Sequence, residues 1–211
     1  MQRLLLNTLT EWKNNPKRKP LILKGVRQCG KTYLLKEFGH QHYSDIAYFN
    51  FEETESLKSL FETDYDTKRI LFELGLSIGK TIKPASTLVI FDEIQECGRA
   101  ITSLKYFCEN APEYHIVCAG SLLGIALNKQ PSFPVGKVDF LTLYPMNFIE
   151  FLMANGEETL AKYLSSFGKG GHLSEPVANK LETYLKQYYV TGGMPEVVQT
   201  WCETHDIEKT E

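Results

Sequence analysis

The stretch Gly25-Val-Arg-Gln-Cys-Gly-Lys-Thr32 decides the fold. It fits the pattern G-x-x-x-x-G-K-[ST], follows the apolar run at residues 20–25 directly and opens a helical pattern at residues 31–38. In such a loop the glycines let the backbone approach an anion closely, so that backbone N–H groups and a helix start face phosphate oxygens. We expect a nucleotide-phosphate site in which Lys31 reaches the β- and γ-phosphates and the Thr32 hydroxyl holds Mg²⁺.

Nine consecutive residues are expected to line the nucleotide, because they form this loop and the first turn of the helix. For Arg27, a solvent-exposed side chain without a ligand is an equal alternative. For Cys29, the favoured interpretation is a small residue whose side chain is incidental. The candidate nucleotide-binding residues are Gly25, Val26, Arg27, Gln28, Cys29, Gly30, Lys31, Thr32 and Tyr33.

A pair of carboxylates, Asp92 and Glu93, follows the apolar run at residues 88–91. Buried carboxylates are costly unless they are paired or bound to metal, and ligands of open α/β sheets bind at the carboxyl ends of the strands. We predict that Asp92 holds Mg²⁺, directly or through another ligand, and that Glu93 polarises an attacking water. Ser121, after the run at residues 114–119, is a candidate γ-phosphate sensor, with a helix N-cap as the alternative. Lys31, Glu93 and Ser121 are thus the candidate catalytic residues.

Five apolar runs alternate with helical patterns along the chain. The runs lie at residues 20–25, 45–51, 87–91, 114–119 and 138–144, and most are continuously apolar, as in strands that are covered on both faces. This alternation predicts an α/β domain of three layers with a parallel sheet. We expect an N-terminal helix within residues 1–17, a core at 18–145, and a region of helices only at 146–211.

Composition excludes several classes of protein. Among 211 residues, 23 basic and 26 acidic side chains leave a net charge of −3, so no global positive field indicates nucleic acid or an anionic membrane as partner, although a local basic patch stays open. Five cysteines without a C-x-x-C pair are typical of reduced thiols in a cytoplasmic protein. No stretch of the sequence is long and apolar enough to span a bilayer.

Two functions, GTP hydrolysis and phosphorylation of a small molecule, fit the sequence poorly. Asn128-Lys129 begins like a guanine-reading N-K-x-D string, but Pro131 stands at its fourth position. A small-molecule kinase of this type usually has an arginine-rich lid, whereas Lys129 is the only basic residue within 122–136. Hydrolysis of an adenine nucleotide fits better.

Six motifs occur in order along the chain: Gly25–Thr32, Tyr48–Glu52, Phe91–Gln95, Ala119–Gly124, Leu143–Phe151 and Gly192–Val198. They resemble those of the AAA-type ATP-binding proteins of bacteria and archaea, whose ATPase core precedes a C-terminal domain of unknown function. The resemblance implies a P-loop fold of the additional-strand catalytic-glutamate type, with strand order 5-1-4-3-2 and a helical lid after Pro145. Gly136-Lys137 stands where members often carry Gly-Arg, which puts an arginine finger there in doubt. Because members are longer, we expect this chain to lack the C-terminal domain.

Together the residues and the resemblance predict an Mg²⁺-dependent ATPase that binds ATP or ADP and acts on an unknown protein partner or on the missing domain. The first alternative is a nucleotide-regulated switch with negligible turnover. The second is an ATPase associated with nucleic acid, which would show a steep salt dependence. Oligomerisation is left open, and no membrane partner is expected.

Overall fold

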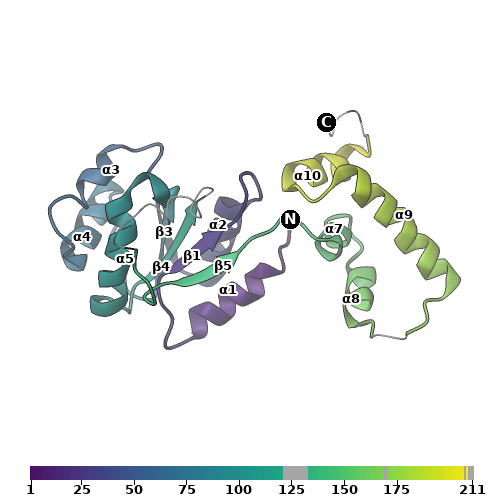
Figure 1. Cartoon of the computed structure of the whole chain (residues 1–211), viewed down its shortest axis with the longest axis horizontal. Coiled ribbons are helices and arrows are strands. Elements are labelled where there is room, and N and C mark those ends of the chain that lie inside the picture. The colour runs from purple at the N-terminus through teal and green to yellow at the C-terminus, as the bar shows by residue number, and fades with distance from the viewer. Residues whose placement is uncertain (121–132, 169–170, 207, 209–211) are drawn as a thin grey trace. The chain divides into compact units, whose positions relative to one another are not determined.

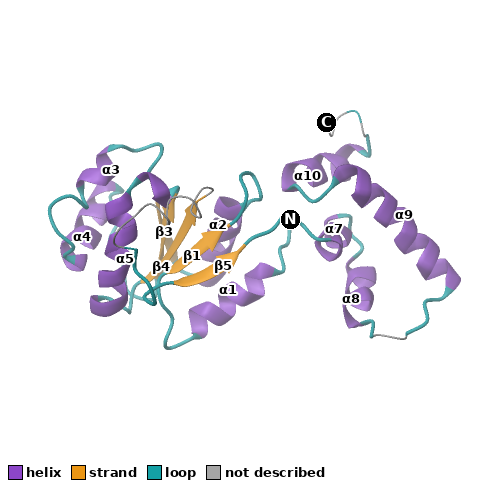
Figure 2. Ribbon diagram, viewed as in Figure 1, coloured by secondary structure: helices purple, strands orange, loops and turns teal. Residues whose placement is uncertain are grey.

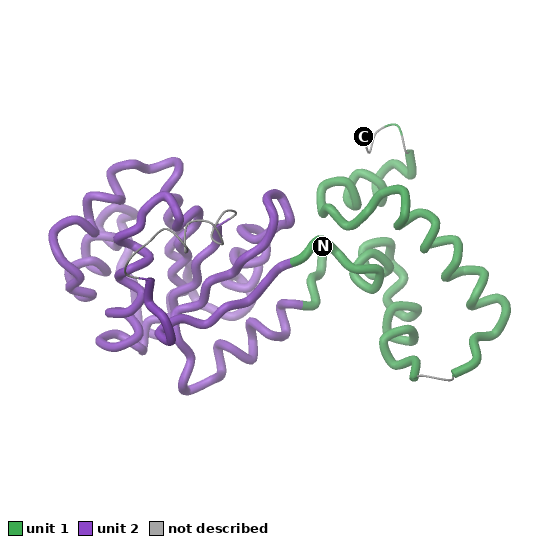
Figure 3. Tube along the Cα trace, in the orientation of Figure 1, with its two compact units in different colours: residues 1–4, 144–211 green, residues 5–143 purple. Residues whose placement is uncertain are grey.

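A computed structural model of the chain describes residues 1–120, 133–168, 171–206 and 208. The chain divides into two compact units, which are coloured separately in Figure 3. Residues 5–143 form the first, called here the sheet unit, and residues 1–4 together with 144–211 form the second, called the helical unit. Each unit is described by itself.

The sheet unit is built on five parallel strands. Their order is β2-β3-β4-β1-β5, which is the predicted order 5-1-4-3-2 counted from the other edge, so this prediction is confirmed. Strand β1, which precedes the loop at residues 25–30, lies between β4 and β5. Strand β4 separates β1 from β3, which ends at Asp92. The strands are β1 (Leu21–Lys24), β2 (Asp45–Asn50), β3 (Thr87–Asp92), β4 (His115–Gly120) and β5 (Asp139–Thr142).

Helices cover both faces of this sheet, which explains why its strands are apolar throughout (Figures 1 and 2). Alternate residues such as Ile22, Val89 and Phe91 pack with α3 (Ser56–Ser59), α4 (Thr67–Ser77) and α5 (Gly98–Asn110). Their neighbours, such as Leu23 and Ile90, pack on the other face with α1 (Leu5–Asn14) and α2 (Lys31–His42). The result is the three-layer α/β architecture that the alternation predicts.

The helical unit contains α7 (Phe148–Ala154), α8 (Glu158–Ser166), α9 (Glu175–Thr191) and α10 (Pro195–Thr204). A capping box starts α7, because the Asn147 side chain accepts from the Glu150 N–H and the Glu150 carboxylate accepts from the Asn147 N–H. The α10 helix has no counterpart among the predicted elements. Gly192-Gly-Met-Pro195 marks a break in the sequence, but Pro195 at the first position of a helix also starts one.

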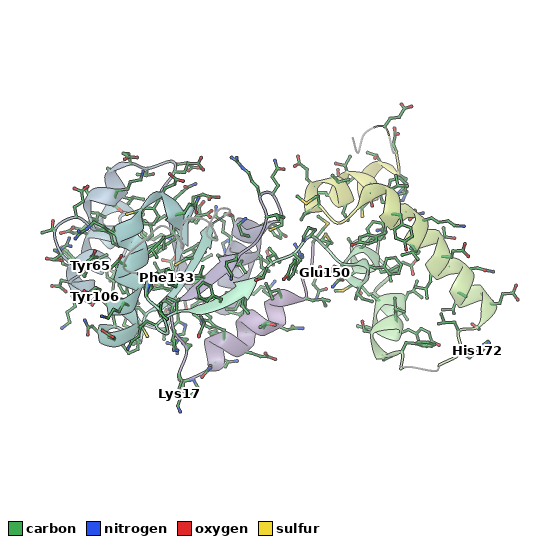
Figure 4. The ribbon with its side chains drawn as sticks, in the orientation of Figure 1. Lys17, Tyr65, Tyr106, Phe133, Glu150 and His172 are labelled. Atoms are coloured by element: carbon green, nitrogen blue, oxygen red, sulfur yellow. The ribbon has the colours of Figure 1, made fainter. Side chains whose placement is uncertain are left out.

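Residues 1–4 join the helical unit through a buried ion pair. The Arg3 Nε lies 3.1 Å from the Glu150 Oε1, and both side chains are about 5% exposed. The same carboxylate oxygen accepts from the Leu4 N–H at 2.8 Å. Figure 4 labels Glu150 at the start of α7. No described helix of either unit is long and apolar enough to cross a membrane.

Candidate nucleotide-binding site

The loop between β1 and α2 is shaped by two left-handed backbone positions. Gln28 has a φ of 63°, and Gly30 has a φ of 89° at the N-cap of α2. Since Gly30 has no side chain, it provides no cap for the first turn of α2. The first N–H groups of a helix have no acceptor within that helix, so a turn capped in this way is suited to bind an anion.

The loop packs closely against Leu143, the first residue after β5. A Cβ atom added to Gly25 would lie 2.4 Å from the carbonyl oxygen of Leu143, which explains the need for glycine. The Cys29 side chain is fully buried, and its Sγ lies 3.6 Å from the same oxygen. Val26 and Tyr33, in contrast, are about half exposed. Within this loop, therefore, the Cys29 side chain faces the protein while those of Val26 and Tyr33 face outward.

Lys31 places its ammonium group inside the loop. Its side chain is buried, and the Nζ donates to the carbonyl oxygens of Gly25 at 3.1 Å and Val26 at 2.8 Å. These contacts hold a positive charge beside the first turn of α2, where the helix dipole also favours an anion. The arrangement concentrates positive potential in a loop whose other outward groups, at Arg27 and Gln28, are exposed.

Asp92, the last residue of β3, is hydrogen-bonded to the first turn of α2, the helix that follows the loop. Its side chain is buried, and its Oδ2 accepts from the Thr32 hydroxyl at 2.7 Å. The same oxygen accepts from the Tyr48 hydroxyl at 2.8 Å, and the Oδ1 accepts from the Glu93 N–H at 3.1 Å. The structure thus brings Thr32 and Asp92 together, and it adds Tyr48, the first residue of the motif Tyr48–Glu52, for which the sequence predicted no role.

Tyr48 enters the site from the neighbouring strand β2. Burial raises the pKa of its hydroxyl, and the hydrogen bond to the Asp92 carboxylate raises that pKa further, so the hydroxyl remains a donor. The Lys36 Nζ lies 3.7 Å from the centre of the Tyr48 ring. In the sequence, Tyr48 lies within the run at residues 45–51 and begins the motif Tyr48–Glu52, but neither feature predicts a contact with Asp92.

Glu93 follows Asp92 in an unusual backbone conformation. It has a φ of 47° and a ψ of 44°, a left-handed conformation that costs a residue other than glycine about 1 kcal/mol or more. The short 3₁₀ helix Ile94–Glu96 follows, and the Gln95 Nε2 donates to the Glu93 Oε2 at 2.6 Å. The Gln95 Oε1 is buried and has no hydrogen-bond partner among the described residues. A buried acceptor of this kind fits a water molecule or other polar ligand beside Glu93.

The oxygen donors of the site fit Mg²⁺. Thr32 and Asp92 offer a hydroxyl and a carboxylate, and Mg²⁺ is commonly held by one or two such protein groups together with phosphates and water. Among the described residues, no cluster of three or more His, Cys, Asp or Glu side chains offers an alternative metal site. Ser121, the candidate sensor, lies outside the described residues, as do Asn128 and Lys129.

Comparison with known proteins assigns the family. Residues 17–152, more than half of the chain, match the AAA domain family. The chain is 26% identical over 189 residues to an uncharacterized protein of Methanocaldococcus jannaschii, which covers 89% of this chain but only 38% of that relative. Whole-protein activity and partners therefore do not follow from this match.

Two solved structures share the fold. A Walker-type ATPase of Pyrococcus abyssi superposes with a TM-score of 0.57 at 18% identity, covering 97% of this chain and 68% of that one. A structure of the Drosophila ORC bound to DNA superposes with a TM-score of 0.51 at 14% identity, covering 93% of this chain and 58% of that one. These two structures support the fold, and the family match over residues 17–152 shows that the chain belongs to the AAA domain family of nucleotide-binding P-loop ATPases.

Proposed function

We propose that the protein binds ATP and ADP with Mg²⁺ and hydrolyses ATP. The observation that carries the proposal is the 2.7 Å hydrogen bond between the Thr32 hydroxyl and Asp92, because it places the loop helix and the acidic strand end at one site. Mg²⁺ bound there would neutralise charge on the phosphate oxygens. Thr32 and Asp92 are the residues that would hold it.

The remaining residues divide the work of hydrolysis. Lys31 and the backbone N–H groups of residues 25–33 bind the phosphates, since the Lys31 ammonium is held within the loop beside the first turn of α2. Glu93 orients and polarises the attacking water as the general base, and the orphaned Gln95 Oε1 supplies an acceptor next to it. Ser121 stays a proposed γ-phosphate sensor.

Steady-state hydrolysis of Mg·ATP tests the proposal. Glu93→Gln keeps the size of the side chain and removes the base, so we expect turnover to fall by about a hundredfold or more while nucleotide binding persists. Lys31→Ala should lose binding as well. Lys17→Ala, at an exposed lysine of the same unit that Figure 4 labels, is the matched control. Equal rates in all four proteins would refute the catalytic assignment.

A second candidate function is a nucleotide-regulated switch with negligible turnover. It is favoured by the Gln95–Glu93 hydrogen bond of 2.6 Å, which engages the carboxylate that should act on water. Tight binding of ATP without hydrolysis at high protein concentration would support the switch. Gln95→Ala should then raise turnover, whereas for an active ATPase the same substitution should lower it.

We further propose that nucleotide binding acts on a protein partner or on a further domain, and that the protein works in the cytoplasm. The net charge of −3 gives no support to nucleic acid as that partner. Capture of partners by the Glu93→Gln protein with ATP tests the first part. DNA or RNA that stimulates hydrolysis, with a steep salt dependence, would favour a nucleic-acid-associated ATPase instead.

A further inference from the structure

Two hydroxyl groups share one oxygen of the Asp92 carboxylate. Thr32 donates from α2 at 2.7 Å and Tyr48 donates from β2 at 2.8 Å, while the other oxygen accepts from the Glu93 N–H at 3.1 Å. An ionised carboxylate offers about four acceptor positions, so protein donors fill most of them. Because donors from two separate elements and from the next residue engage both oxygens, they fix the rotation of the carboxylate as well as its position.

Tyr48 is itself held by the loop helix. The Lys36 ammonium lies 3.7 Å from the centre of its ring, on the electron-rich face that attracts a cation. Lys36 follows Thr32 by four residues on α2, so both side chains project from the same face of that helix. The contacts Thr32–Asp92, Asp92–Tyr48 and Tyr48–Lys36 therefore begin and end on α2.

We propose that Tyr48 is a positioning residue for the metal site: its hydroxyl holds Asp92 in the orientation that keeps the Thr32 oxygen available to Mg²⁺. Tyr48 acts through Asp92, and the inference rests on the proposed binding of Mg²⁺ with a nucleotide. Residues that orient metal ligands in this way typically contribute 10–100-fold to metal affinity, which is the scale expected here.

The test is the Mg²⁺ dependence of nucleotide binding, measured with ADP that carries a fluorescent label on its ribose. Tyr48→Phe removes the hydroxyl and keeps the ring. We expect the Mg²⁺ concentration at half-maximal binding to rise by about tenfold, with ADP affinity in EDTA unchanged within about twofold. Lys36→Met keeps the aliphatic stem and should shift the Mg²⁺ midpoint by a smaller factor of about two to three.

Tyr65→Phe is the matched control, because Tyr65 is also half-buried and also carries a cation over its ring, the Arg99 guanidinium at 4.8 Å. It stacks on Tyr106 with ring centres 4.7 Å apart, and Figure 4 labels both. The Mg²⁺ midpoint of this variant should equal that of the wild type. Thermal unfolding of each variant reports any loss of stability separately.

The outcomes separate the two levels of the inference. If Tyr48→Phe leaves the Mg²⁺ midpoint unchanged, or weakens binding in EDTA as much as in Mg²⁺, the positioning role is wrong while the proposed function stands. If the wild type binds no nucleotide under either condition, the proposed function fails, and the role of Tyr48 fails with it.

Discussion

Two tyrosines of the sheet unit stand in similar surroundings with different consequences. Tyr48 has Lys36 over its ring at 3.7 Å and a hydrogen bond to Asp92. Tyr43 has Lys13 over its ring at 4.7 Å, and its hydroxyl oxygen lies 2.7 Å from the His115 Nδ1. Each combines a cation, an aromatic ring and a titratable partner.

The hydrogen-bond partners of the two tyrosines differ: the partner of Tyr48 lies at the candidate nucleotide site, and the partner of Tyr43 lies in the core. Asp92 ends β3 at the carboxyl edge of the sheet and also binds Thr32 of the loop helix, so its network continues to groups that a ligand can reach. His115 begins β4, is 5% exposed, and meets the edge of the Trp12 ring with centres 6.1 Å apart. Similar local chemistry thus lies beside the proposed ligand site at one end of the sheet and within the core at the other.

The largest effect is expected at the carboxyl edge. Lys31→Ala removes the ammonium that lies inside the loop, so binding of Mg·ADP should weaken by about a hundredfold or more. The free energy of unfolding should change much less. Isothermal titration with Mg·ADP and urea denaturation measure the two quantities, and a variant with unaltered affinity would contradict the role of Lys31.

At the amino ends of the strands, where His115 begins β4, the expected effect is on stability and depends on pH. Burial, with the positive charges of Arg18 and Lys13, lowers the pKa of His115 from 6.5 to about 4. The unfolded chain binds this proton more readily, so stability is complete above pH 6.5 and falls as the pH decreases from 6.5 to 4, by about 3 kcal/mol at most.

Urea denaturation across this pH range tests the assignment. His115→Gln keeps an amide that can bond with Tyr43 but does not titrate, so the fall in stability below pH 6.5 should be smaller than in the wild type. Nucleotide affinity at pH 7 should be unchanged. Equal pH profiles for the two proteins would mean that other groups cause the loss in acid.

A smaller effect is expected from Gly25→Ala, which disturbs both the shape of the loop and its packing. In Gly25→Ala the new methyl group would lie 2.4 Å from the Leu143 carbonyl oxygen, so the loop or residue 143 must shift. We expect a loss of about 1–3 kcal/mol in unfolding free energy together with weaker nucleotide binding. Gly136→Ala is a control: although Gly136 has a positive φ of 72°, no atom of the described residues lies within 4 Å of its added methyl group, so strain acts there without a clash.

The smallest effect is expected when each of the two tyrosines is replaced by phenylalanine. Tyr43→Phe removes the hydrogen bond to His115, which should cost about 1 kcal/mol of stability, and should leave the Mg²⁺ midpoint of ADP binding unaltered. Tyr48→Phe should raise the Mg²⁺ midpoint by about tenfold, in addition to any loss of stability from its own missing hydrogen bond. A Mg²⁺ shift in both variants would remove the distinction between the two ends of the sheet.

Much of the sheet unit can be predicted from sequence because its determinants are local. The motif Gly25–Thr32 and the run ending at Asp92 are contiguous signals, and continuous apolar strands indicate a sheet covered on both faces. The contacts of Tyr48 and Gln95 cannot be predicted in this way. They depend on strand register, in which Asn50 of β2 pairs with Asp92, and on a 3₁₀ turn after β3.

Two other features cannot be predicted, one because its partners are far apart in the chain and one because its sequence signal is ambiguous. Arg3 and Glu150 are separated by 147 residues, and neither position carries a pattern that would join them. Gly192-Gly-Met-Pro195 is equally suited to end one helix and to start the next, so the sequence predicts helices in this region without marking α10 as a separate one.

The Arg3–Glu150 pair also determines how the protein can be dissected. Since residues 1–4 belong to the helical unit, that unit consists of two separate pieces of chain, and a fragment of residues 144–211 would keep Glu150 without its cation. An unpaired buried charge costs several kcal/mol, so such a fragment should fold poorly unless a peptide containing residues 1–4 is added back.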